Sequence, residues 1–145
     1  MRLNWMAILV AAVTHWLLGA VWFTVFARTW MADLRMPEEQ LQAYRAHPNF
    51  WPYVIAFLCS LVLAYVIARV LAGSEWHNVF RGIRVGILVG LAAAAAMVTE
   101  MVFEMMGVSF MAIAAGYPLL GCILMAIILG AWKPKPLPGR EATAP

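Results

Sequence analysis

The sequence predicts an all-α, polytopic membrane protein in which four transmembrane helices form one bundle. Of its 145 residues, 65% are hydrophobic and only 12% are charged, whereas soluble proteins carry about 25% charged residues. Four apolar stretches are each long enough to cross a hydrocarbon core of about 30 Å, which takes roughly 20 helical residues. They cover residues 5–26, 50–71, 82–106 and 110–132.

These stretches use most of the chain, so we expect residues 1–132 to form a single four-helix transmembrane domain. Residues 133–138 have a proline at every second position. The segment 133–145 is too polar and too short to pack, and we expect a disordered tail. The first stretch follows Met1 and Arg2 as a secretory signal would. Its apolar run is too long for a signal and no cleavage site follows it, so we expect it to be retained.

The first span carries His15 near its midpoint, and small residues such as Ala11, Ala12 and Gly19 share its face. Because close helix approach in lipid depends on small side chains, this face is expected to meet another helix. After this span, Pro37, Glu38 and Glu39 predict the start of a short extracytoplasmic helix, since proline and acids favour the first turn.

The second span has a four-residue repeat of small side chains, formed by Ala56, Ser60, Ala64 and Ala68. The fourth span carries the small residues Gly116 and Gly121, and Pro118 between them removes one backbone hydrogen bond and is expected to kink the helix. Each of these spans therefore offers a face suited to tight helix packing.

In the third span Gly82, Gly86 and Gly90 recur every four residues. At about 100° per residue, Glu100 returns to the angular position of Gly82, and Glu104 returns to that of Gly86. We therefore expect both acids to face whatever the glycines pack against. Acidic side chains within a span are costly and usually mark a bundle interior or a wet cavity, so they are the first candidates for a site.

Several sequence elements resemble the bacterial four-span membrane family catalogued as domain of unknown function 1761. They are Asn4-Trp5-Met6-Ala7, Gly19-Ala20-Val21-Trp22, Phe103-Glu104, and Ala115-Gly116-Tyr117 leading to Gly130-Ala131-Trp132. The resemblance covers nearly the whole chain and implies a four-span membrane protein without an established activity.

Orientation follows from the basic residues near the ends of the spans. Three of the ten lie on one side, Arg28, Arg35 and Arg45; the other seven gather on the opposite side, at Arg2, Arg69, Arg81, Arg84, Lys133, Lys135 and Arg140. The positive-inside rule then puts both termini in the cytoplasm. With the bacterial resemblance, we expect a multi-pass protein of the inner membrane.

Several function classes are disfavoured by composition. The arginines sit at span ends and form no basic stripe, so nucleic acid is not an expected partner. Cys59 and Cys122 lack metal-ligand spacing, and neither a metal, a disulfide nor a cofactor is expected. No hydroxyl has a matched base and orienting acid in the sequence, so we expect a protein that is not an enzyme.

Three residues are the candidate proton, cation or polar-network site: Glu100, Glu104 and His15. In one hypothesis Glu100 is a protonatable or cation-binding carboxylate with His15 as its relay partner. In the other, Glu104 is an interfacial or turn-capping residue and His15 forms a hydrogen bond between helices. Haem ligation by His15 would need a second histidine at membrane depth, which only a dimer could supply.

Two classes of function remain. The first is a non-enzymatic membrane protein that acts as a homo-oligomer or as an accessory subunit of a larger membrane complex, which the small-residue faces favour. Its helix-packing residues would include Gly82, Gly86, Gly90, Gly19, Gly116 and Gly121. The alternative is a small proton- or cation-coupled transporter or channel that uses Glu100 with His15 and Glu104. In both classes the protein is surrounded by the lipid bilayer.

Overall fold

The computed structural model describes residues 3–33, 37–46, 49–73 and 78–132, and this part of the chain is all-α. The predicted tail after Trp132 lies outside the described residues. Four long helices, α1 (Trp5–Val25), α4 (Trp51–Ala72), α5 (Val79–Phe103) and α6 (Val108–Ala131), are each long and apolar enough to cross a membrane. They correspond to the four predicted spans.

The third span begins earlier than predicted, at Val79 and not at Gly82. Asn78 caps this helix, because its side-chain Oδ1 accepts a hydrogen bond of 2.9 Å from the backbone N–H of Arg81. An asparagine cap satisfies one of the amide groups that the first helical turn leaves unpaired. Hydropathy alone does not show this start, because Asn78 and Arg81 are polar.

The described residues between α1 and α4 form two short helices, and not one: α2 (Ala27–Asp33) and α3 (Glu38–Ala46). The start of α3 agrees with the prediction from Glu38 and Glu39. Helix α2 was not predicted. It follows α1 after a turn at Phe26 and is held by Trp30, whose ring stacks on Phe110 of α6 with centroids 4.0 Å apart.

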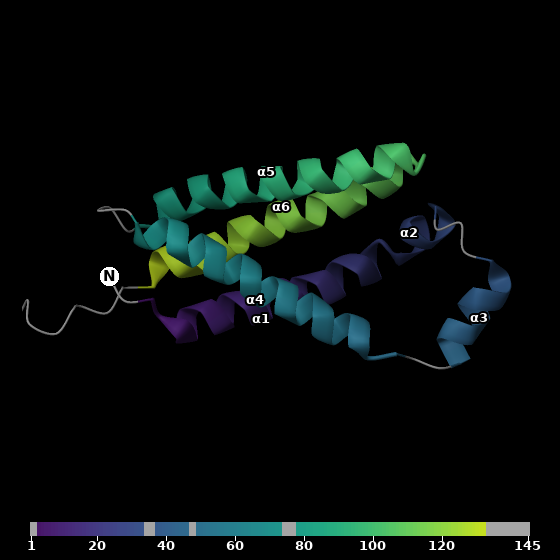
Figure 1. Ribbon diagram of the computed structural model, residues 1–145, viewed down its shortest axis with the longest axis horizontal. Helices are drawn as coiled ribbons and strands as arrows, with labels where there is room; N and C mark the ends of the chain where they lie inside the picture. The colour runs from purple at the N-terminus through teal and green to yellow at the C-terminus, as the bar shows by residue number, and fades with distance from the viewer. Residues whose placement is uncertain (1–2, 34–36, 47–48, 74–77, 133–145) are drawn as a thin grey trace, which may run out of the picture.

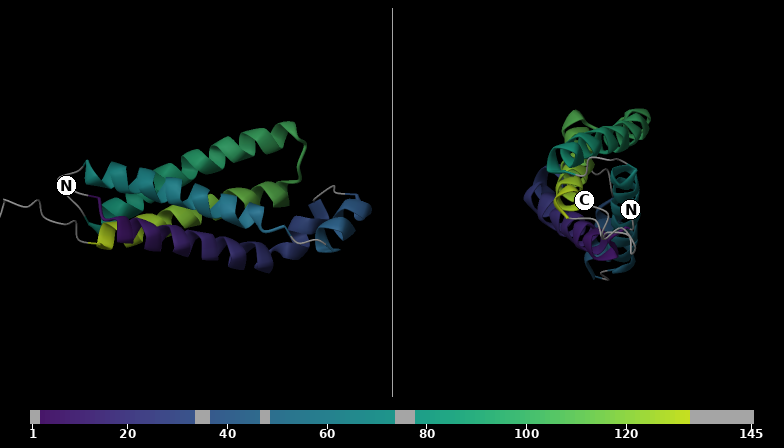
Figure 2. Two further views of the ribbon diagram at one scale, coloured as in Figure 1. Left: turned by 60° about the horizontal axis from the view of Figure 1, so that its bottom comes forward. Right: turned by 90° about the vertical axis from the view of Figure 1, so that its left-hand side faces the viewer.

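Helix α6 lies at the centre of the bundle, in contact with α1, α2, α4 and α5. Figure 1 shows α5 and α6 side by side, with α4 crossing α1 on the other side of the molecule. The core lies between α1, α4 and α6, with smaller contributions from α5. Its largest fully buried side chains are Ile67, Leu71, Met125, Cys122 and Ser60. Both described ends of the chain lie at the same end of the bundle (Figure 2).

Helices α5 and α6 form an antiparallel pair whose backbones touch at the glycines of α5. A Cβ atom added to Gly86 would lie 2.7 Å from Ile123 Cα, and one added to Gly90 would lie 2.9 Å from Leu119 Cα. At Gly82 an added Cβ would overlap the carbonyl of Ala126. Only glycine allows this approach, which agrees with the way small residues permit close packing of helices in lipid.

Candidate functional site

Of the two buried polar side chains described in the bundle, Ser60 and His15, the larger is His15, which is 3% exposed. Its Nδ1 atom lies 2.8 Å from Ser60 Oγ of α4 and 3.1 Å from the Tyr117 hydroxyl of α6. The rings of His15 and Tyr117 are also in contact, with centroids 4.7 Å apart. Three helices thus contribute to one polar group of residues, which we call the His15 cluster (His15, Ser60 and Tyr117).

The hydrogen-bond partners of His15 favour the tautomer with the proton on Nδ1. The Ser60 hydroxyl has one proton and lies 2.9 Å from the carbonyl of Ala56, one turn earlier in α4, to which it donates. The contact between Ser60 Oγ and His15 Nδ1 fits either tautomer; with the proton on Nδ1, this nitrogen donates to Ser60 Oγ and the Ser60 hydroxyl keeps its hydrogen bond to Ala56. The Tyr117 hydroxyl in turn donates to the backbone carbonyl of His15, at 3.3 Å.

In this arrangement His15 Nε2 carries a lone pair and has no hydrogen-bond partner. A Cβ atom added to Gly121 would lie 2.6 Å from Nε2, so the imidazole occupies the space that a side chain would otherwise take. Gly19 does the same for Tyr117, because its added Cβ would lie 2.9 Å from the hydroxyl oxygen. A buried, unprotonated imidazole nitrogen can accept a proton or a hydrogen bond.

A second polar link lies towards the α5–α6 loop. The indole Nε1–H of Trp22 donates to the backbone carbonyl of Ile113, at 3.0 Å. Gly116 makes room for this ring, because its added Cβ would lie 2.9 Å from Trp22 Cζ2. Helices α1 and α6 are therefore joined at two levels, at Tyr117 and at Trp22.

Glu100 and Glu104 lie elsewhere. Both are exposed, and the expectation that they face the packing partner of the glycines is wrong. Four residues advance about 400° around a helix, so each step of the glycine repeat moves the contact by about 40°. By Ala94, the next buried residue of the series, the contact with α6 has moved about 120° away from the direction of Gly82 and Glu100.

The two helices also draw apart towards the loop that joins them (Figure 2), which leaves the last turns of α5 uncovered. Glu104 is the C-terminal capping residue of α5, and Met105 after it has a φ of 54°. Glu104 thus lies at the turn between α5 and α6, as one of the two interpretations of this residue expected.

His15 and the acids are not brought together within one chain. The ring of His15 lies at the level of Gly121 and Tyr117 in α6, opposite the part of α5 near Gly90. Glu100 is ten residues beyond Gly90, which is about 15 Å along the helix. The candidates therefore separate into the His15 cluster inside the bundle and Glu100 on its surface.

A family model described as "Protein of unknown function (DUF1761)" matches residues 6–130. The chain belongs to this family. Neither a curated protein nor a solved structure matches the chain. Membership of the DUF1761 family and four helices able to cross a membrane make it a multi-pass membrane protein.

In this member of the DUF1761 family, no three His, Cys, Asp or Glu side chains of the described residues are grouped in a way that could hold a metal ion. The two cysteines differ in position, because Cys122 is buried beside the α5 glycines whereas Cys59 is exposed on α4. Cys59 is therefore not part of the packed interior.

Two members of the His15 cluster were missed as site residues. Ser60 belongs to the small-residue repeat of the second span and was therefore predicted only as a packing residue, although its hydroxyl is a polar group on the packed face of α4. Tyr117 follows Gly116 in a sequence element of the family, and a polar aromatic residue beside a packing glycine is a usable signal. Both signals point to buried positions but do not say which helix lies opposite.

Proposed function

We propose that the protein is a non-enzymatic membrane component that acts by associating with other transmembrane helices through the exposed side of α5. The observation that carries this proposal is the position of Glu100, a carboxylate on the surface of a transmembrane helix without a hydrogen bond or an ion pair to another described residue. A side chain of this kind is stabilised when another helix covers it.

The depth of Glu100 supports this proposal. Helix α5 runs from Val79 to Phe103, so its midpoint is Leu91. Glu100 is nine residues further, about 14 Å along the axis, and the hydrocarbon core extends about 15 Å from its centre. The carboxylate therefore lies at the inner edge of the headgroup region, where lipid does not solvate it as water would.

The surroundings of Glu100 suit a second helix. Small side chains are exposed beside it on α5, in contrast to the large apolar side chains that cover most of the lipid-facing surface. We call this surface the α5 outer face, formed by Ala92, Ala95, Ala96, Thr99 and Glu100. Small residues in adjacent turns let two backbones approach closely and form hydrogen bonds across the interface.

A second copy of the chain is the simplest partner. A two-fold axis beside the α5 outer face would bring two Glu100 side chains together across the interface. An accessory role in a larger complex would place a polar or basic side chain of another protein at the same position. Both arrangements use the same surface and differ in the identity of the partner.

The deciding measurement is the intact mass of the complex, by native mass spectrometry after mild extraction from the host membrane. A small whole number of chains indicates a homo-oligomer, and additional polypeptides indicate an accessory subunit. Recovery of the single chain alone, at every detergent concentration tested, would contradict the proposal.

Disulfide cross-linking in membranes locates the surface. In a background with Cys59→Ser and Cys122→Ala, the variant Ala96→Cys should form cross-linked dimers if the partner is a second copy. Val21→Cys is the matched control, because Val21 is exposed on α1 at a similar depth, next to the Trp22 that reaches Ile113. Equal cross-linking at both positions would mean random collision and not an interface.

The alternative is a proton- or cation-coupled transporter that uses Glu100 with His15 and Glu104. It is favoured by the buried Nε2 of His15, which has no partner. Against it stands the separation of about 15 Å between the levels of His15 and Glu100. Flux measured in proteoliposomes tests it, because both His15→Gln and Glu100→Gln should abolish flux in a relay, and flux that persists in either variant excludes one.

We further propose that the end of the bundle that carries Arg69, Arg81 and Arg84 faces the cytoplasm of a bacterial cell, with both termini on that side. The support is the positive-inside rule. A reporter fused after the C-terminal tail, active only in the cytoplasm, should be active, and the same reporter inserted after Met105 should be inactive. The reverse pattern would overturn this orientation.

A further inference from the structure

A groove of about 530 Å³ runs along the first turns of α5 and differs in chemistry between its two ends. Asn78, Arg81 and Arg84 supply polar groups, and Phe80, Val85 and Leu88 supply an apolar surface. Four of these residues, at positions 81, 84, 85 and 88, follow the spacing of one helical face. Arg81 and Arg84 thus lie on the outer side of Val85 and Leu88, whereas Phe80 lies at the outer end of the groove beside the arginines.

Both arginines of the groove lack a counter-ion within the described part of the chain. Asn78 uses its Oδ1 to cap α5, so its NH₂ group remains available as a donor. The positive end of the α5 dipole lies at the same place. Guanidinium and amide donors grouped in this way are suited to a phosphate group, which arginine can bind through two parallel hydrogen bonds.

The depth of the arginines adds a second argument. Arg81 is ten residues from the midpoint of α5, about 15 Å along the axis, which is the level of the headgroups. Arg84 is about 10 Å from the midpoint, so its guanidinium must extend towards the surface or pair with an anion. An anion at the membrane surface between these two side chains would satisfy both.

From this geometry we propose that the groove is a binding site for an anionic phospholipid. Arg81, Arg84 and the Asn78 amide bind the phosphate, and the first part of one acyl chain lies along Val85 and Leu88. This site is distinct from the α5 outer face, which begins one turn further along the helix, and the proposal does not depend on the proposed function.

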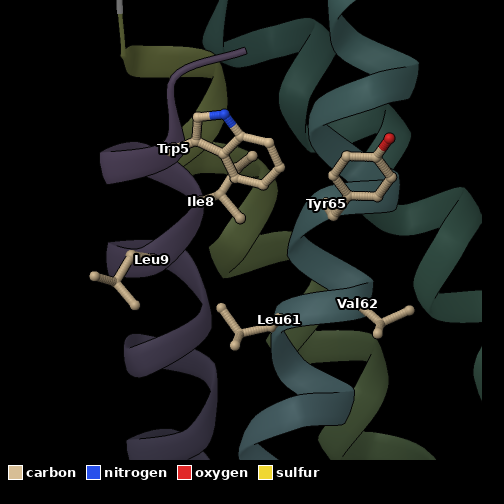
Figure 3. A pocket seen from close by; sticks show the side chains of 6 residues that line it. All are labelled: Trp5, Ile8, Leu9, Leu61, Val62 and Tyr65. Atoms are coloured by element: carbon tan, nitrogen blue, oxygen red, sulfur yellow. The ribbon is translucent and has the colours of Figure 1, made fainter.

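A second groove of about 530 Å³ provides an internal comparison. It lies between α1 and α4 and is lined by Trp5, Ile8, Leu9, Leu61, Val62 and Tyr65 (Figure 3). The rings of Trp5 and Tyr65 stack across it with centroids 6.0 Å apart. Its lining has no charged side chain, so any acyl chain can lie there and no preference among headgroups is expected.

The test is a lipid titration of the full-length, delipidated protein, followed by native mass spectrometry. Phosphatidylglycerol and phosphatidylcholine with identical acyl chains are compared. A basic residue near the surface contributes about a fivefold gain in affinity for anionic lipid. We therefore expect phosphatidylglycerol to bind at least fivefold more tightly, and equal binding of the two lipids would overturn the proposal.

Variants locate the site. Arg81→Gln and Arg84→Gln should each weaken phosphatidylglycerol binding about fivefold and weaken phosphatidylcholine binding less, because the choline cation already offsets the charge of its phosphate. Arg69→Gln is the matched control, because Arg69 is in the last turn of α4 at the same end of the bundle but does not line the groove. An equal loss in the control would mean a general charge effect and would refute a specific site.

Inorganic phosphate in large excess distinguishes the lipid from the free anion. Phosphate lacks the acyl chain and should not displace bound phosphatidylglycerol, and Leu88→Ala should weaken lipid binding because it shortens the apolar wall. Complete displacement by phosphate would assign the groove to a free anion and overturn the lipid proposal. The comparison of the two lipids on the unmodified chain remains decisive even if an arginine variant fails to fold.

Discussion

The Nδ1 atom of His15 lies 2.8 Å from the hydroxyl oxygen of Ser60, and this contact joins α1 to α4 inside the bundle. Ser60 Oγ also lies 2.9 Å from the carbonyl of Ala56, and with the proton on His15 Nδ1 both contacts of this hydroxyl are hydrogen bonds. Tyr117 reaches the same ring from α6. The side chain of His15 on α1 thus contacts both of the other helices that form the core, α4 and α6.

Ser60→Ala removes the partner of His15 Nδ1 and should lower the free energy of unfolding by about 0.6–1.7 kcal/mol, the range found for hydrogen bonds between helices in lipid. The measurement is reversible unfolding in mild detergent or bicelles. Thr14→Ala is the control, because the Thr14 hydroxyl donates only to the carbonyl of Val10 in its own helix. A loss as large in the control would show that the cost is local to the helix and not due to the His15 cluster.

Gly121→Ala should destabilise the bundle by about 1–3 kcal/mol, the usual cost of overpacking a core. The added methyl group would lie 2.6 Å from His15 Nε2, so the ring or the helix must move. His15→Ala should relieve the overlap, and a double-mutant cycle should therefore show coupling between the two positions. Additive effects would contradict this contact, whatever the size of the single changes.

Gly86→Ala should cost more stability than Gly19→Ala, because the two added methyl groups meet different obstacles. At Gly86 the neighbours are backbone atoms of Ile123 and Cys122, at 2.7 and 2.8 Å, which cannot rotate away. At Gly19 the neighbour is the ring end of Tyr117, which can shift. Gly73→Ala, whose added methyl group would meet only carbonyl oxygens at 3.7 and 3.9 Å, should be nearly neutral. Thermal unfolding of the three variants checks this order.

The fold could be predicted because four long apolar spans leave few alternatives in a chain of this length. Helix α2 could not, since its stability depends on the stacking of Trp30 on Phe110, two residues that are far apart in the sequence. The buried face of α1 was found from its small residues. The N-terminal capping of α5 by Asn78 is a local signal that a hydropathy pattern overlooks.

The candidate site was predicted only in part, because a periodic pattern describes one helix and a site depends on several. The burial of His15 could be predicted from the small residues that share its face of the first span. Its contacts with Ser60 and Tyr117 could not, because they depend on how α4 and α6 cross α1. The predicted position of Glu100 was wrong for a geometric reason. A four-residue repeat winds around its helix, so the face of α5 that contacts α6 changes along the helix. Glu100, five full turns after Gly82, points in the same direction as Gly82 but no longer faces α6.

Glu100→Leu should shift the assembly equilibrium towards the single chain. The leucine side chain is stable against lipid, so the variant removes both the cost of an uncovered carboxylate and the hydrogen bond that a partner would provide. A hydrogen bond between helices of about 1–2 kcal/mol corresponds to a change of about 5- to 30-fold in the dissociation constant. Glu100→Gln keeps a polar side chain of the same length and should retain most of the association.

Glu104→Leu is the matched control for this change. Glu104 lies four residues further, about 20 Å from the midpoint of α5 and outside the hydrocarbon core, so its carboxylate can be solvated by water and does not need a partner. Association is measured by energy transfer between labelled chains while the protein is diluted into excess lipid. A change in the dissociation constant confined to Glu100→Leu would assign the interface to the α5 outer face. Equal behaviour of the Glu100 and Glu104 variants would place the contact surface on another helix.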